Sequence, residues 1–364
     1  MRGPLSFLKS WTYFTNPGKP AFENLTTEGP YAGTKQAHKT GRTLRSRYGH
    51  LVSRTRPTRF WSCSSPRDVE TARHFAHGFF GPRWETDGSA HLQIIPEAPR
   101  QGADTLTPGD TCFRYRTDDT EGHDLGYHKL SYWQPLFAQP IIERLTPLSG
   151  GVLLTPVDIY SMMEMCGFEI LARGYSPWCA VFTQDEWLQF EYARDLLHFY
   201  RAGPGNQYAG AMGWLWLNAT QELMSNHSSH DVYFSFVHDG DIAPLMATLQ
   251  ILDEHALIQE LPTDRMKEDR RWRTSDVVPM GGRVVFERIT CEHDPGETRR
   301  YVRLFINDAL MKPPGIPAAR EIEHGLRLRD FQEFVESRRD VFGDFQDVCM
   351  IPLTAPSRIT FLHQ

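Results

Sequence analysis

The chain has 364 residues, 40% hydrophobic and 12% aromatic, so it can bury one large core or two of ordinary size. The net charge is −6 and charged residues make up 23%, so the protein has no excess of positive charge that would attract nucleic acid or an anionic membrane. A small molecule is therefore the default partner. No apolar run is long enough to span a bilayer, and residues 1–14 lack the apolar core and cleavage site of a signal peptide.

The N-terminal third of the chain contains a predicted strand followed directly by a predicted helix. The aromatic run Arg59–Cys63 predicts the strand, and the Ser-Ser-Pro-Arg after it is typical of a helix start, with Ser as the cap and Pro in the first turn. Helical spacing continues over Asp68–Phe80, and an earlier helix is predicted over Thr34–Tyr48. In α/β proteins the turn between such a strand and helix is a place for ligands.

Helical patterns dominate residues 125–225, including Pro140–Leu145, Val157–Met165 and Asp185–Tyr200. This block interrupts the α/β pattern. We therefore predict a discontinuous α/β core, residues 1–124 and 226–364, with an inserted, mainly helical subdomain at residues 125–225.

A second strand and helix follow the helical block. Val232–Val237 is a nearly continuous β-branched and aromatic run, which predicts a strand buried on both faces. Asp241 is then predicted to cap a helix that runs to Ile251. His238 and Asp239 are therefore expected at the carboxyl end of a central strand.

The last clear signal is a pair of alternating runs, Arg283–Cys291 and Tyr301–Asn307, which predicts two antiparallel strands. Residues 260–282 are charged and without periodicity, and we interpret them as a loop. Together the elements predict a mixed α/β fold, with a sheet flanked by helices.

Three residues are candidates for chemistry at these strand ends. An imidazole and a carboxylate at His238 and Asp239 suit anion binding and proton donation, and Arg67 at a helix start could bind phosphate together with backbone N–H groups. From the residues alone, a purely structural role for each stays open. Asp239 could cap the following helix, the ring of His238 could hydrogen-bond to the backbone, and Arg67 could be an ordinary surface residue. Arg73-His74 lies within a helix and has no loop to hold a phosphate.

The six cysteines show no CxxC and no Cys/His cluster at zinc spacing, so no metal site is predicted, and disulfides or buried thiols remain open. N-glycosylation sequons at Asn24, Asn218 and Asn226 argue against a cytosolic location.

Two motifs resemble those of the fungal histidine acid phosphatases, a family that includes phytases. Ser64 to Phe75, SSPRDVETARHF, resembles the segment whose Arg binds phosphate. Ser235 to Ile242, SFVHDGDI, resembles the His-Asp motif, whose His binds phosphate and whose Asp protonates the leaving group. Further similar stretches lie at 33–51, 105–112, 166–169, 191–206 and 301–308, so the resemblance covers nearly the whole chain.

The resemblance implies a histidine-phosphatase-like fold with a mixed sheet, flanking helices and an inserted helical subdomain. It implies hydrolysis of phosphate monoesters through a phosphohistidine, with Arg67 and His238 on the phosphate, Asp239 as proton donor and no cofactor. It also implies secretion, the disulfides Cys112–Cys349 and Cys166–Cys179, and an unpaired Cys291.

One family feature has no copy in the 364 residues: the signature Arg-His-Gly-x-Arg-x-Pro, which carries the nucleophilic His and two phosphate-binding Arg residues. By resemblance it lies upstream of the segment that begins this chain, and it supplies a central strand. We therefore expect that strand and the nucleophile to be missing.

Three hypotheses follow from this departure. The sequence is an N-terminally incomplete form of a secreted acid phosphatase, or a family member repurposed for another small molecule, or a pseudoenzyme that binds a phosphorylated ligand without cleaving it. Made as written, without a signal peptide, the chain is expected in the cytoplasm.

Overall fold

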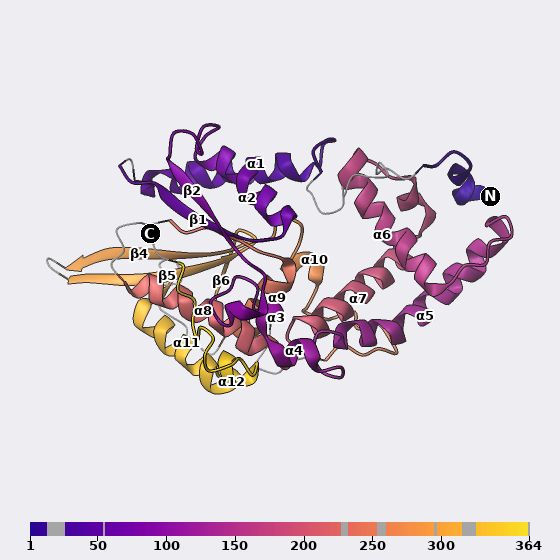
Figure 1. Ribbon diagram of the computed structural model, residues 1–364. Helices are drawn as coiled ribbons and strands as arrows, with labels where there is room; N and C mark the ends of the chain where they lie inside the picture. The colour runs from indigo at the N-terminus through magenta and orange to yellow at the C-terminus, as the bar shows by residue number, and fades with distance from the viewer. Residues whose placement is uncertain are drawn as a thin grey trace.

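The structure is a computed structural model of the chain, shown in Figure 1, and it describes residues 1–12, 26–53, 55–226, 232–252, 260–294, 297–314 and 325–362. Its strands form two separate sheets. None of the helices in these ranges combines the length and hydropathy that a bilayer-spanning helix needs.

The first sheet is parallel and has the order β2-β1-β3, with β1 (Thr58–Cys63) between β2 (Ala90–Ile95) and β3 (Ser235–Phe236). All six residues of β1 pair with β2, whereas only Trp61 and Ser62 pair with β3. The carboxyl ends of the strands therefore meet at one edge of the sheet.

The prediction of a central strand over Val232–Val237 was wrong in two respects. Only Ser235 and Phe236 form a strand, and this strand lies at the edge of the sheet rather than in its centre. Its side chains are half-buried instead of covered on both faces. Because β1 offers partners for only two residues, the apolar run alone did not determine the strand's length.

Helices cover both faces of this sheet because the side chains of β1 alternate in direction. Phe60 packs with residues of α2 (Pro66–Phe79), which lies against α1 (Gly33–Tyr48). The neighbouring Trp61 packs on the opposite side, against α8 (Ala209–Ser225). Figure 1 shows α1 and α2 on one side of β1 and β2 and α8 on the other.

The helical part of the chain consists of α5 (Leu125–Leu145), α6 (Pro156–Arg173), α7 (Gln184–Arg201) and α8. In Figure 1, α5, α6 and α7 extend to the right of the sheets, while α8 lies among α9 (Asp239–Leu249), α11 (Leu328–Phe342) and α12 (Phe345–Val348). The expected helices are present, but α5 begins well before Pro140 and includes two prolines. No residue of α8 is fully exposed, and its first half is apolar or small throughout, so the contrast between its faces is weak.

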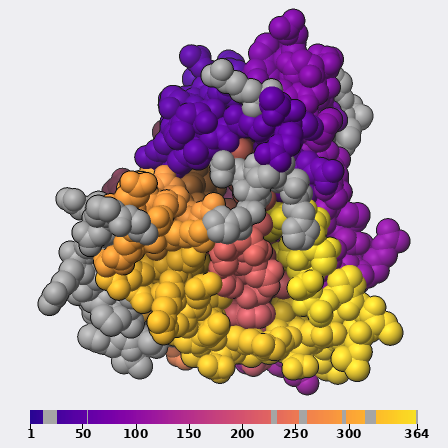
Figure 2. Space-filling view, turned by 90° about the vertical axis from the view of Figure 1, so that its left-hand side faces the viewer, coloured from indigo at the N-terminus to yellow at the C-terminus, as the bar shows by residue number. Residues whose placement is uncertain are grey.

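The predicted antiparallel pair is confirmed as β4 (Val284–Asp294) and β5 (Glu297–Ile306), and β6 (Ala309–Met311) and β7 (Leu326–Arg327) also pair with β5. Tyr48 of α1 donates a hydrogen bond to Glu287 of β4, so the N-terminal helices contact this sheet. Figure 2 shows the indigo N-terminal residues on the same face as the orange residues of this sheet and the yellow C-terminal residues.

The remaining helices are short, and most of them connect the larger elements. The α-helical turns are α3 (Pro108–Thr111), α4 (Phe113–Thr117) and α10 (Thr274–Val277). The 3-10 helices within the described ranges are η1 (Gly3–Lys9), η3 (Gly49–Leu51), η4 (Pro99–Gln101), η5 (Thr146–Leu148) and η6 (Pro177–Val181).

Residues 260–282 are largely a loop, as predicted, but this loop contains a buried charge. Arg270 is only 5% exposed, and its Nε lies 2.5 Å from Oδ2 of the equally buried Asp195 in α7. The charged composition therefore reflects ion pairs with α7 as well as exposure to solvent.

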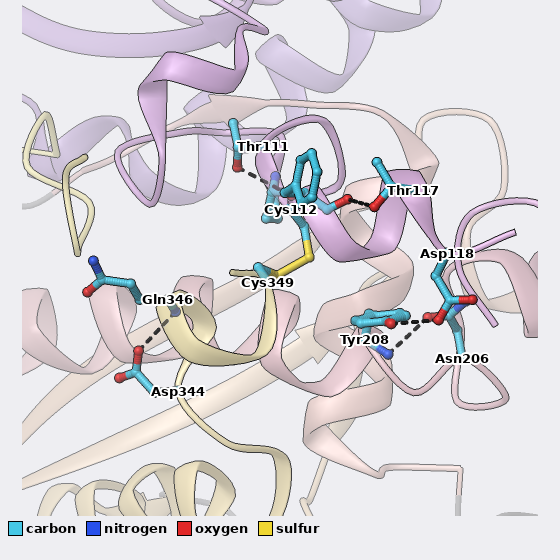
Figure 3. The surroundings of a disulfide bond; sticks show 11 residues. Thr111, Cys112, Thr117, Asp118, Asn206, Tyr208, Asp344, Gln346 and Cys349 are labelled. Atoms are coloured by element: carbon cyan, nitrogen blue, oxygen red, sulfur yellow. Dashed lines mark hydrogen bonds between the residues drawn. A yellow bond between two sulfur atoms is a disulfide. The ribbon is translucent and has the colours of Figure 1, made fainter. Parts of the chain in front are cut away.

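Both disulfides implied by the resemblance are present, and Cys63 and Cys291 are free thiols. Cys112, just before α4, is joined to Cys349, just after α12, as Figure 3 shows. Nearby, Tyr208 donates a hydrogen bond to Asp118 over 2.7 Å, so α8 is attached to the turn after α4.

Candidate functional site

His238 occupies the turn between β3 and α9, where the backbone leaves the sheet. The helix begins at Asp239, so Asp241 is its third residue and not the cap that the sequence predicted. The reason is local: the backbone N–H of His238 donates to Oδ2 of Asp241 over 3.2 Å, which makes His238 the cap position.

The His238 ring lies between two carboxylates. Its Nε2 is 2.7 Å from Oε1 of Glu97, and its Nδ1 is 3.1 Å from Oδ2 of Asp68. The thiol of Cys63 is 3.8 Å from Nε2. Each neighbour is at or just beyond the carboxyl end of a strand of the first sheet: Cys63 ends β1, Glu97 follows β2 and Asp68 lies in the first turn of α2.

Burial and negative charge determine the electrostatics of this cluster. Burial raises the pKa of the Asp68 carboxyl, although the neighbouring His238 opposes the shift. Burial, with Asp68 and Glu97 nearby, raises the pKa of the Cys63 thiol far above its ordinary value. Burial and then the charge of Asp110 raise the pKa of Asp241. The surroundings of His238 therefore favour protons and cations.

Asp239, the residue after His238, contacts the helix α7. Its side chain is 51% exposed, and its Oδ2 lies 3.5 Å from Nδ1 of His198 in α7. The other ring nitrogen of His198 is 3.0 Å from Nη2 of Arg194. Burial and the charge of Arg194 lower the pKa of His198 to about 4. The exposed carboxylate is thus held beside a neutral imidazole and remains accessible to a ligand.

Arg67 lies in the first turn of α2, with its side chain exposed. Its charge acts to lower the pKa of the adjacent Asp68, which in turn contacts His238. The structure therefore brings the start of α2 to the His238 cluster. Arg73 and His74 lie further along the helix, beside Glu85 and Glu70 respectively, as expected for a helix surface.

The sequence did not indicate Cys63, Glu97, Asp68 or His198 as neighbours of His238 and Asp239. The strand β2 was not predicted at all, so the position of Glu97 just beyond its end could not be recognised. For Cys63 and Glu97, the signal that would have found them is the rule that parallel strands end at a common edge, applied once the sheet order is known. The position of His198 follows from the packing of α7, for which the sequence carries no signal.

The sequons lie in different surroundings. Asn226 is exposed at the end of α8, whereas Asn218 is half-buried within that helix and donates from its amide nitrogen to Glu222 over 3.2 Å. Asn24 is outside the described residues. Glycosylation stays a prediction.

Comparison with known proteins identifies the class. Residues 1–307 match the family model of the histidine phosphatase superfamily, branch 2. The chain is 32% identical to a phytase of Candida albicans over 99% of this chain and 75% of that relative. It is 31% identical to an acid phosphatase of Komagataella pastoris over the same shares of the two chains. The chain belongs to this branch of the histidine phosphatase superfamily.

Solved structures agree on the fold. The phytase from D. castellii superposes with a TM-score of 0.87 and 26% identity, over 99% of this chain and 75% of that chain. The complex of the Bifidobacterium longum multiple inositol polyphosphate phosphatase with phosphate superposes with a TM-score of 0.57 and 15% identity, over 82% and 77%. The mixed α/β fold predicted from the sequence is confirmed, and the chain spans about three quarters of these relatives.

Proposed function

We propose that this chain carries the phosphate-binding and proton-donating residues of a phosphate monoesterase. In this proposal Arg67 and His238 bind the phosphate, and Asp239 gives a proton to the leaving alcohol. The substrate is a small phosphate monoester, and no cofactor takes part.

The observation that supports this function best is the meeting of two helix N-termini at one edge of the sheet. Asp68 in the first turn of α2 lies 3.1 Å from His238, which caps α9. Helix N-termini offer unpaired N–H groups and a partial positive charge, and both favour an anion. Arg67 adds a guanidinium at the same end of α2.

The carboxylate of Glu97 disfavours the binding of an anion next to His238. Its Oε1 lies 2.7 Å from Nε2 of His238, the nitrogen that a phosphate oxygen would use. A bound phosphate must displace this carboxylate, and the two negative charges repel one another. We therefore expect Glu97→Gln to bind inorganic phosphate more tightly than the unaltered chain does.

The same proposal limits catalysis by these 364 residues alone. They contain no Arg-His-Gly-x-Arg-x-Pro, and removing a nucleophile that acts as part of a unit costs on the order of 10⁶ in rate. Cys63 is no substitute, because its raised pKa keeps the thiol protonated. The 364-residue chain is expected to bind phosphate esters with little turnover. Its two disulfides support a secreted protein.

The test combines binding and turnover on the purified chain. Calorimetry with inorganic phosphate is expected to show binding that Arg67→Ala weakens about tenfold, the loss of one charge-assisted contact. Release of phosphate from p-nitrophenyl phosphate and phytate, between about pH 3 and about pH 7, is expected to stay at background. Joining a relative's Arg-His-Gly-x-Arg-x-Pro segment to the N-terminus should give turnover that Asp239→Asn abolishes.

Two results would contradict the proposal. Phosphate binding that Arg67→Ala leaves unchanged would remove this end of α2 from the site. Hydrolysis by the unaltered 364 residues that Asp239→Asn abolishes would show that another group serves as the nucleophile.

A further inference from the structure

Three different metal-ligand types meet at the carboxyl edge of the first sheet. Cys63 ends β1, Glu97 follows β2 and His238 follows β3, so each of the three strands supplies one of them. Their ligand atoms all lie within 4.8 Å of one another. Sequence spacing predicted no metal site, but it detects only ligands close together in the chain, and His238 is 141 positions from Glu97.

We propose that Cys63, Glu97 and His238 bind one divalent transition-metal ion of the zinc type. A thiolate, an imidazole and a carboxylate form a ligand set that Zn²⁺ accepts, whereas Mg²⁺ and Ca²⁺ require oxygen ligands. Three protein ligands leave the fourth tetrahedral position to water. The ion would use the same Nε2 of His238 as the proposed phosphate, so the two are alternative ligands of one pocket. The test of the metal site uses no phosphate, so its failure is distinguishable from a failure of the phosphatase proposal.

Two of the three distances between ligand atoms are close to those of such an ion, and the third, between Cys63 and Glu97, is within 4.8 Å. With Zn–S of about 2.3 Å and Zn–N or Zn–O of about 2.0 Å, ligand atoms in a tetrahedral site stand roughly 3.2 to 3.6 Å apart. The sulfur of Cys63 lies 3.8 Å from Nε2 of His238, and Oε1 of Glu97 lies 2.7 Å from the same nitrogen. Shifts on the order of 0.5 Å would bring both pairs to these separations.

Asp68 is placed to supply the second interaction that metal-bound histidines need. Its Oδ2 is 3.1 Å from Nδ1 of His238, the ring nitrogen that faces away from Cys63 and Glu97. The two atoms lie at ion-pair distance, but Asp68 Oδ2 is a buried oxygen that forms no hydrogen bond in this structure. A small rotation of the His238 ring would let Nδ1 donate to it, which would fix the ring orientation and leave Nε2 for the metal.

Charge and access also favour a cation. The thiol of Cys63 is fully buried, and the ring of His238 beside it contacts two carboxyl groups, those of Asp68 and Glu97. The side chains of His238 and Glu97 keep 26% and 20% of their surface exposed, so an ion can reach them from solvent. Binding would replace the thiol proton with the metal.

Cobalt is the probe for this site, because Co²⁺ bound to a thiolate absorbs in the near ultraviolet. The chain, with its two disulfides intact, is stripped with a chelator, titrated with Co²⁺ and then with Zn²⁺. We expect a sulfur-to-cobalt band that saturates at about one equivalent and that Zn²⁺ removes. Cys63→Ser should abolish the band, and Asp68→Asn should weaken Zn²⁺ binding about 10- to 100-fold. Glu97→Gln should also weaken metal binding, the opposite of its expected effect on phosphate.

The matched control is Cys291→Ser, since Cys291 is the other free thiol of the described residues and lies in β4, in the second sheet. This variant should keep the band. The proposal is overturned if the unaltered chain shows no band, if Cys63→Ser retains it, or if Cys291→Ser loses it. Should Cys63→Ser fail to fold by circular dichroism, unchanged Zn²⁺ affinity in Glu97→Gln, whose side chain is partly exposed, overturns the proposal instead.

Discussion

His198 is a buried histidine in surroundings that disfavour a positive charge. Burial and the charge of Arg194 lower its pKa to about 4, although Asp239 acts in the opposite direction. In the unfolded chain a histidine titrates near pH 6.5, so between about pH 6.5 and about pH 4 the folded chain binds fewer protons. This contribution to stability is complete above that window and is lost as the pH falls through it.

We therefore predict that acid destabilises the chain through His198 by on the order of 3 kcal/mol across this window. Urea unfolding at a series of pH values should show the decline, and His198→Gln should flatten it while keeping a polar partner for Arg194. His91→Gln, which alters an exposed residue of β2, should keep the slope of the unaltered chain. An equal slope in His198→Gln would assign the acid sensitivity to other groups.

A second residue-scale prediction concerns the buried pair of Asp195 and Arg270. Besides the guanidinium, Asp195 accepts a hydrogen bond from the backbone N–H of Thr274 over 2.6 Å. Asp195→Asn should lower the free energy of unfolding by about 3 kcal/mol, because it leaves the Arg270 charge buried without its closest counter-charge. Urea titration measures this loss.

The control for that variant is the exposed pair of Asp264 and Arg265, whose side chains are 71% and 74% accessible. Asp264→Asn should change the free energy of unfolding by less than about 1 kcal/mol. Similar losses in both variants would contradict the argument from burial.

The sequence predicted those site residues whose position follows from local pattern. His238 and Asp239 could be placed at a strand end because the apolar run stops there and a helical pattern begins. Glu97 and His198 could not, because their contacts depend on the order of strands in the sheet and on the packing of α7. Neither the strand order nor the packing of α7 can be predicted from the spacing of residues in the sequence.

At the scale of elements, α1 and α2 cross where each helix has a glycine. A Cβ on Gly41 would stand 2.2 Å from the carbonyl oxygen of Phe75, and one on Gly78 would stand 2.1 Å from that of His38. These contacts are with backbone atoms, which cannot turn aside as a flexible side chain could. The two helices can approach this closely only with hydrogen at both positions.

Gly41→Ala should therefore destabilise the chain by about 1–3 kcal/mol, the usual cost of overpacking, and Gly78→Ala should do the same. Gly167→Ala in α6 is the matched control, since its Cβ would meet nothing within 4 Å. That variant should gain up to about 1 kcal/mol from helix propensity. Thermal and urea unfolding of the three variants would measure these changes. A higher free energy of unfolding in Gly41→Ala would contradict the close approach of the two helices.

The two disulfides close loops of very different length, with sequence separations of 237 and 13. Chain entropy then predicts a loss of about 5 kcal/mol on replacing Cys112 and Cys349 by Ser, and about 3 kcal/mol for Cys166 and Cys179. Unfolding of the two double variants in urea compares them. The reverse ranking would mean that the long loop is already restricted in the unfolded state.

Elements with a polar face or an alternating pattern were predicted well, as with α1, α2 and the β4–β5 pair. Two elements were not predicted well. α8 has no fully exposed residue, so its pattern shows little contrast, and β3 forms over only two residues of a longer apolar run. Helix starts were misjudged where a proline lies inside a helix, as at Pro140 in α5.

At the scale of the whole molecule, the mixed α/β fold could be predicted because strand–helix units and a late antiparallel pair are both visible in the sequence. The division into a discontinuous core and a helical subdomain at residues 125–225 stays a prediction. The packing of α8 against α9 and α11 bears on where its boundary lies. Two separate sheets could not be distinguished, since strand order is a property of the assembled chain.

The disulfide between Cys112 and Cys349 turns most of the chain into a covalent ring, and residues 1–111 form a tail outside it. Arg67 and Glu97 belong to the tail, whereas His238 and Asp239 belong to the ring. Among the described residues of the first sheet, the two sides pair through Trp61 and Ser62 with β3. The site therefore connects the tail to the ring. Displacing the tail would separate Arg67 and Glu97 from His238 and Asp239, and it would also open the apolar cluster that Trp61 and Leu106 share with α8, while the ring stays covalently closed.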